Sequence, residues 1–156
     1  IDYLHGELNK NNLATKDIIL EIDERDVVSS PSNKNDVIKR LVNEKFTIVL
    51  DNFLGGYDTL SPIRNMNIHS VKLDCDNLKL EQANDGDVAI LGALISLANG
   101  LDIKVIGKNI ESMNASKRFT NIGGTVAQGV FLSKPLSYDA FTDWLVRREL
   151  VKNTFE

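Results

Sequence analysis

Short apolar runs, rich in β-branched residues, alternate with helix-like segments along almost the whole chain. No linker-like or low-complexity stretch interrupts this alternation. Apolar strands that alternate with helices pack into a parallel sheet covered by helices, so the pattern predicts an α/β fold. Five strand-helix units fit the length of 156 residues. The predicted strands are 17–22, 46–51, 70–75, 103–108 and 126–132.

The segments between the strands show helical spacing of apolar residues. Such spacing predicts helices over 37–42, 88–98 and 137–148. Gly100 is expected to end the second of these helices, and Ser137 is a suitable N-cap for the third. The glycine pair that starts at Gly123 is expected to end a further helix before the last strand.

Two architectures share this alternation, and the placement of polar residues separates them. Five units would make a complete flavodoxin-like open sheet, or the last five eighths of a (β/α)8 barrel of roughly 250 residues. Each predicted strand carries one strongly polar residue inside it or at its end. A charge in a buried strand is costly without a partner, so these residues are expected to converge on one site. A barrel gathers all strand ends on one rim, which favours a (β/α)8 TIM-type barrel. The residues are Glu21, Asp51, Lys72, Lys108 and Gln128.

Composition excludes several classes of function. The net charge of −4 and the pI near 5.2 argue against a DNA or RNA surface, because nucleic-acid affinity comes mainly from Lys and Arg. The single Cys75 forms no internal disulfide, which suits the reducing cytoplasm. No apolar stretch reaches the 18 or so residues that span a bilayer, so no membrane contact is expected from this chain. The chain begins at Ile1 without an initiator Met, which favours a cytoplasmic part of a longer protein, either free or membrane-anchored.

Simpler readings of the polar residues remain open at this stage. Lys72 and Asp74 alternate with apolar neighbours, which by itself describes a half-exposed strand. Lys108 can also end a strand in solvent. His5 and His69 have no partners at metal-ligand spacing and are expected to be ordinary surface or hydrogen-bonded histidines.

Five stretches together resemble, in order and spacing, the later motifs of EAL domains, the bacterial phosphodiesterases that open cyclic di-GMP. The resemblance runs from about residue 20 to residue 145 and implies a modified (β/α)8 barrel. The first third of that domain, with its Glu-Ala-Leu signature and an asparagine metal ligand, has no counterpart in this chain. Residues 1–156 are therefore expected to form the C-terminal part of one EAL-like domain, an incomplete barrel. The stretches are LEIDE (20–24), DNFLGGYDTL (51–60), KLD (72–74), VIGKNIES (105–112) and AQGVFLSKPL (127–136).

The resemblance also implies a role for each matching position. EAL phosphodiesterases use two divalent metals, held by carboxylates, to activate water and to stabilise charge on the phosphate. Six positions are retained: Glu21 as a metal ligand, Glu24 as a support of the DDFGTG loop, Asp51 as a ligand shared between metals, Lys72 near the attacking water, Glu111 as the second glutamate of EGVE, and Gln128 as a contact to guanine.

Two decisive positions depart from the family. Asn52 replaces a metal-binding aspartate, and Lys108 replaces the first glutamate of EGVE, which makes the site three charge units more positive. A divalent cation needs anionic oxygens, and an ammonium group repels it. Leu54 also replaces a glycine that can require a special backbone conformation. The expected state is a catalytically inactive EAL-like domain without a cofactor, with Mg or Mn bound only if residual activity exists.

Several functions stay open after this reading. The domain is either a cyclic di-GMP receptor, with Gln128, Lys108 and Asp51 as ligand-binding residues, or a protein-interaction module with a protein partner or a second copy as a homodimer. Lys108 can face a phosphate directly. The alternatives are an active phosphodiesterase, a dimerisation or scaffold domain without nucleotide binding, and a flavodoxin-like response module.

Overall fold

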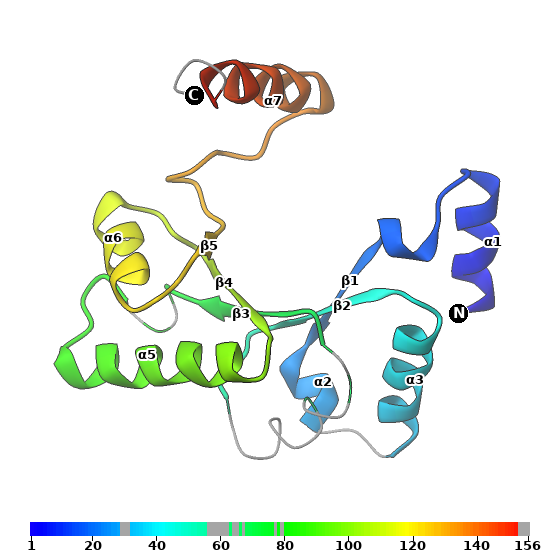
Figure 1. Ribbon diagram of the computed structural model, residues 1–156, viewed down its shortest axis with the longest axis horizontal. Helices are drawn as coiled ribbons and strands as arrows, with labels where there is room; N and C mark the ends of the chain where they lie inside the picture. Colours follow the sequence, from blue (N-terminus) through cyan, green and yellow to red (C-terminus); the bar gives the residue numbers. More distant parts are fainter. Residues whose placement is uncertain are drawn as a thin grey trace.

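The computed structural model describes residues 1–28, 32–55, 63, 66, 68–76, 78 and 80–152, which form a parallel sheet flanked by helices (Figure 1). The strands are β1 (Ile19–Asp23), β2 (Thr47–Asp51), β3 (Ser70–Asp74), β4 (Lys104–Lys108) and β5 (Val126–Ala127). The helices are α1 (Asp2–Lys10), α2 (Glu24–Val28), α3 (Ser32–Asn43), α5 (Asp85–Gly100), α6 (Met113–Asn121) and α7 (Tyr138–Lys152), with a 3₁₀ turn at Thr15–Asp17.

The strand order decides between the two predicted architectures. The sheet runs β1-β2-β3-β4-β5, and every neighbouring pair is parallel. In a flavodoxin-like sheet the order is 2-1-3-4-5, whereas strands of a (β/α)8 barrel follow one another in sequence order. The predicted barrel architecture is confirmed, with five of its strands among the described residues.

The strand register brings the carboxyl ends of the strands to one edge. Asp23 pairs with Asp51 across β1 and β2, and Asp74 pairs with Lys108 across β3 and β4. These four residues are the last of their strands. Polar side chains at the strand ends therefore face a common rim.

The core lies between the middle strands and the helices that cover them. Ile48 and Leu50 of β2 and Val71 of β3 are almost completely buried. Burial of each such side chain stabilises the fold by about 1.5–3 kcal/mol. In Figure 1, α5 runs alongside this part of the sheet, and Leu91 and Ile95 are buried from its inner side.

Local signals set the helix ends largely as predicted. Helix α5 starts with a capping box, in which Asn84 accepts from the backbone N–H of Asp87 and the Asp87 carboxylate accepts from that of Asn84. Gly100 is its last residue. Helix α6 is followed by Gly123, whose φ of +97° is the left-handed conformation that glycine adopts readily. Helix α3 extends beyond the predicted 37–42 on both sides.

The prediction of a strand over 126–132 is wrong beyond residue 127. After β5 the chain stays next to the end of β4: the Gln128 N–H bonds to the Gly107 carbonyl, and the Gln128 carbonyl accepts from Ile110. The chain then turns, with the Leu132 N–H donating to the carbonyl of Gly129. This segment therefore forms a turn and not a strand, although its apolar pattern is typical of a strand.

Helix α7 forms where it was predicted, but most of its apolar side chains stay exposed among the described residues. Ser137 caps it as expected, with its hydroxyl accepting from the Ala140 N–H. Phe141 and Trp144 stack on each other at 6.1 Å between ring centroids, yet Phe141 and Leu145 remain exposed. Figure 1 shows α7 held away from the sheet at the end of an extended segment. Across the described ranges, no helix combines the length and the apolar character that crossing a membrane requires.

Candidate functional site

The ammonium group of Lys108 lies at the centre of the polar rim. It contacts both carboxylate oxygens of Asp51, at 2.8 and 3.0 Å, and the amide oxygen of Asn52 at 2.7 Å. A carboxylate oxygen of Asp74 lies 3.8 Å away. The Lys108 side chain is only 17% exposed, so solvent screens these contacts incompletely. The interpretation of Lys108 as a solvent-exposed strand end is wrong.

Asn52 connects this cluster to the end of β1. Its amide nitrogen donates to the Asp23 carboxylate at 2.7 Å, while its amide oxygen accepts from Lys108. The Arg25 guanidinium binds both oxygens of Asp23 at 2.9 Å. Arg25 first, and Asn52 second, hold the pKa of Asp23 well below its usual range. Arg25, Asp23, Asn52, Lys108 and Asp51 thus form one continuous polar chain.

A second ion pair lies two residues before the ends of β1 and β3, and its Glu21 side chain is 49% exposed. The Lys72 ammonium bonds to the Glu21 carboxylate at 2.5 Å. All five residues of β3 are buried, and Lys72 is among them, so the reading of this segment as a half-exposed strand is wrong. The pair joins β1 to β3, and the Lys108–Asp51 pair joins β4 to β2. In a (β/α)8 barrel each interior layer is filled by alternate strands, which explains why both pairs skip one strand.

The loop after β2 is supported from below by Glu24. The Glu24 carboxylate is buried, and its Oε2 atom accepts from the backbone N–H of Leu54 at 2.9 Å. Its Oε1 atom has no hydrogen-bond partner within the described part of the chain. Among the described residues of this loop, Asn52 (φ +55°) and Gly55 (φ +70°) are left-handed. Leu54 is not among the described residues with positive φ, so it creates no backbone strain at its position.

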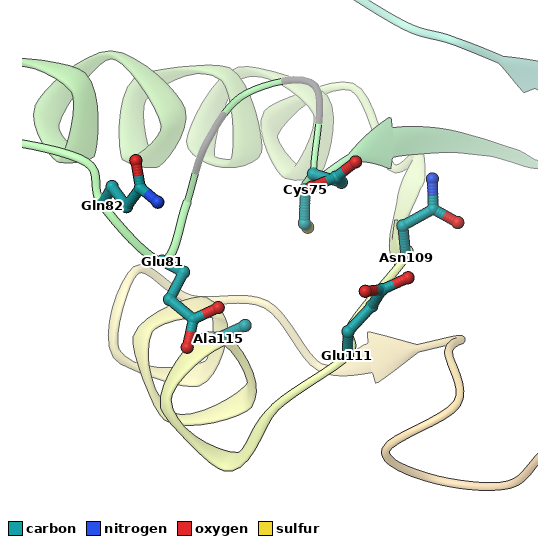
Figure 2. Close-up of a pocket in the computed structure, with 7 residues that line it drawn as sticks. Cys75, Glu81, Gln82, Asn109, Glu111 and Ala115 are labelled. Carbon is teal, nitrogen blue, oxygen red and sulfur yellow. The ribbon is translucent and has the colours of Figure 1, made fainter.

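Glu111 lies on the wall of a separate cavity. This cavity has a volume of about 400 Å³, and Figure 2 shows the side chains around it, among them Ala115 of α6. Cys75 follows β3, Glu81 precedes α5, and Asn109 and Glu111 follow β4. Burial first, and the charge of Asp74 second, raise the pKa of the Cys75 thiol to about 12, so the thiol is neutral at physiological pH.

Gln128 stands at the other end of the rim. Its backbone is fixed to Gly107 and Ile110, while its side chain is exposed. The structure therefore brings Glu21 and Lys72 together, and Asp51, Asn52 and Lys108 together. Glu111 and Gln128 are placed at the margins of that cluster rather than within it.

Four residues of this cluster were not assigned to it from the sequence: Asp23, Arg25, Asp74 and Asn109. Asp74 faces Lys108 and accepts a hydrogen bond at 3.1 Å from the amide of Asn109. Asp23 receives the Asn52 amide. Asp23 and Asp74 are the last residues of their strands, and this position was the available signal, because strand ends meet at the rim of a barrel.

The described residues do not fit a pair of divalent metals. Both oxygens of Asp51 already bind an ammonium group, and Glu21 is bonded to another. Within the described ranges, no three His, Cys, Asp or Glu side chains are grouped so that they could hold a metal ion. Asn52 offers one neutral oxygen, which is already shared with Lys108. In this arrangement the acidic groups of Glu21 and Asp51 are paired with the ammonium groups of Lys72 and Lys108.

Parallel strands in sequence order, with polar side chains layered at their carboxyl ends, define a (β/α)-barrel domain whose site lies on the barrel rim. A profile of the EAL domain matches residues 1–135. The chain therefore belongs to the EAL domain family. The match begins earlier in the chain than the motifs that first indicated it.

Relatives with known descriptions agree with this assignment. The chain is 23% identical over 137 residues to the cyclic di-GMP phosphodiesterase RocR of Pseudomonas aeruginosa, covering 88% of this chain and 35% of RocR. The crystal structure of the EAL domain of Mycobacterium smegmatis DcpA is 25% identical, with a TM-score of 0.80 over 94% of this chain and 65% of that one. The EAL enzyme Bd1971, in its form bound to cAMP and cyclic di-GMP, is 25% identical, with a TM-score of 0.81 over 92% of this chain and 38% of that one. The chain spans between 18% and 35% of the length of the curated relatives that it matches.

Proposed function

We propose that this chain is part of an EAL-like domain in cyclic di-GMP signalling that does not hydrolyse the nucleotide. The observation that carries the proposal is the contact of the Lys108 ammonium with Asp51 and Asn52. Metal-dependent hydrolysis of a phosphodiester needs carboxylates that are free to hold cations and to activate water. In this chain those oxygens face an internal cation, which a divalent metal would have to displace.

We propose that the rim retains the ability to bind cyclic di-GMP without metal. A cavity of about 370 Å³ opens beside the cluster, and both a cation and apolar groups line it. Arg25 adds a positive charge to the wall of this cavity, and its guanidinium keeps N–H donors beyond the two that bind Asp23, so it can donate to a phosphate oxygen. Gln128 is exposed just after β5, at the other end of the rim, where its amide can pair with a base edge. Cyclic di-GMP is present in the structure of the relative Bd1971, which supports this choice of ligand. The residues that line the cavity are Arg25, Asn52, Phe53, Leu54, Asp74 and Leu78.

A protein-interaction role has its own support. Apolar side chains are exposed on α5, where Ile90 is 64% exposed and Leu97 40%. Helix α7 adds the exposed side chains of Phe141, Leu145 and Val146. Exposed apolar rows of this kind mark protein contacts in many proteins, and either a second copy or another protein can provide the contact. Receptor and interaction roles are compatible, because ligand binding at the rim can be read out through these helices.

Calorimetry of cyclic di-GMP in EDTA tests the receptor proposal. We expect saturable binding to the wild-type protein and weaker binding to Gln128→Ala. Asn99→Ala is the matched control, because it removes an exposed amide at the far end of α5. No heat with the wild-type protein in EDTA would exclude the receptor role. A single species in sedimentation at all concentrations, with no partner bound, would exclude the interaction role.

A further inference from the structure

The contacts of Lys108 resemble the oxygen shell of a bound cation. Four oxygen atoms from three side chains surround its nitrogen: both of Asp51, one of Asn52 and one of Asp74. Carboxylate and carbonyl oxygens are the ligands that magnesium and manganese prefer. The oxygen atoms around the ammonium group are thus of the kind that a metal ion prefers. The ammonium group, however, carries one positive charge, whereas a magnesium or manganese ion carries two.

Strand ends fix these oxygens independently of Lys108. Asp51 ends β2 and Asp74 ends β3. The backbone next to Asp51 is held by the hydrogen bond from the Phe53 N–H to the Lys72 carbonyl at 2.9 Å. The backbone next to Asp74 is held by the bond from the Cys75 N–H to the Lys108 carbonyl at 3.0 Å. Removing the ammonium group therefore leaves the acidic oxygens in place.

The side-chain amide of Asn52 is suited to lie between the Lys108 ammonium group and the Asp23 carboxylate. An amide offers an oxygen to one neighbour and N–H groups to another, and Asn52 uses both sides, toward Lys108 and toward Asp23. An aspartate at position 52 would place its carboxylate against the carboxylate of Asp23. The neutral amide is therefore suited to bridge a cation and an anion, and this need exists because Lys108 supplies the cation.

We propose that Lys108 is a tethered cation that replaces a divalent metal at the rim, and that Asn52 is its matched partner. This inference rests on the proposed function, because it explains how the fold keeps its acidic rim without a metal. Restoring carboxylates at both positions is expected to create a site for one divalent cation per chain. Asp51, Asp74 and the new carboxylates would be its ligands.

Manganese calorimetry and thermal melting after EDTA treatment test this inference on four proteins: wild type, Lys108→Glu, Asn52→Asp/Lys108→Glu and Lys104→Glu. Lys104 is exposed at the start of the same strand, so the control makes the same charge change away from the rim. We expect saturable Mn²⁺ binding and a raised Tm for the double variant, with affinity at least about tenfold tighter than for wild type or Lys104→Glu. A folded double variant that responds like Lys104→Glu overturns the inference.

A neutral variant covers the case in which the double variant does not fold. Lys108→Ala leaves Asp51 and Asp74 without the ammonium group, so Mn²⁺ is expected to raise its Tm more than that of wild type. An equal response of the two proteins overturns the inference. The proposed function has a separate test, because hydrolysis of cyclic di-GMP by the wild-type protein would overturn it. The metal-binding results described above do not depend on that assay.

Discussion

The packing of the Phe119 ring against β4 should contribute to the stability of the fold, and substitutions at both sides of this contact can measure the contribution. Phe119 is buried on α6, and its ring lies between two glycine backbones. A Cβ atom built at Gly107 would lie 2.7–2.9 Å from ring atoms, and one at Gly124 would lie 2.3–2.4 Å from them. Real Cβ atoms are not found at such distances, so the ring requires glycine at both positions. Gly107 directly precedes Lys108, which links this packing to the rim.

The packing of the ring sets the expected change in the free energy of unfolding for each substitution. Gly107→Ala forces the ring or the strand to move, and such overpacking costs about 1–3 kcal/mol. Phe119→Ala removes a fully buried ring and costs about 3–5 kcal/mol. In the double variant the new methyl group enters the space that the ring has left. We therefore expect Gly107→Ala to cost close to zero in the Phe119→Ala background, which is a coupling of about 1–3 kcal/mol.

Urea unfolding of the four proteins of this cycle measures the coupling, from the midpoint and the slope of each transition. Gly100→Ala is the control, because a Cβ atom there meets no atom within 4 Å. It should change stability by less than about 0.5 kcal/mol and show no coupling to Phe119. If Gly107→Ala costs the same with and without the ring, the packing argument is wrong.

Three further predictions concern other parts of the fold. The Cys75 thiol, with its pKa raised to about 12 by burial, should resist alkylation at pH 8 in the native protein and react in urea. The pKa of this thiol is higher in the folded than in the unfolded state, so its contribution to stability is complete below about pH 8.5 and is lost as the pH rises toward 12. Unfolding of Cys75→Ala at a series of pH values checks this, because the variant should lack the thiol's share of the loss of stability at high pH. Glu24→Ala should lower stability by about 1–3 kcal/mol in urea unfolding, because the Leu54 N–H loses its charged acceptor, whereas Glu24→Gln keeps an acceptor and should cost less. Gly129→Ala should be destabilising because its Cβ would lie 2.1 Å from the Ile110 carbonyl oxygen, and a thermal melt equal to that of Gly100→Ala would refute this.

Much of the architecture could be predicted from the chain because strand and helix periods are local properties. The alternation indicated five parallel strands, and the polar residues at strand ends indicated a rim where they meet. The residues Glu21, Asp51, Lys72 and Lys108 do meet, as two ion pairs between alternate strands. Charge and spacing alone could not show which cation pairs with which anion, since that depends on which interior layer each side chain enters.

Other features depended on contacts between distant residues. The bond between Asn52 and Asp23 joins side chains 29 positions apart and depends on the register of β1 and β2. The apolar run after Ala127 looks like strand, but the close approach of Gly129 to Ile110 turns the chain. The periodicity of α7 predicted an apolar face, but periodicity does not say what covers a face.

If the internal ammonium group of Lys108 takes the place of a metal, the protein should not hydrolyse cyclic di-GMP. Incubation of the purified protein with cyclic di-GMP and Mn²⁺, followed by chromatography of the nucleotides, measures this. We expect no more linear dinucleotide than in a sample without protein, even at high protein concentration. Linear product that accumulates with time, and that is not formed when EDTA is present, would show that the site still uses metal.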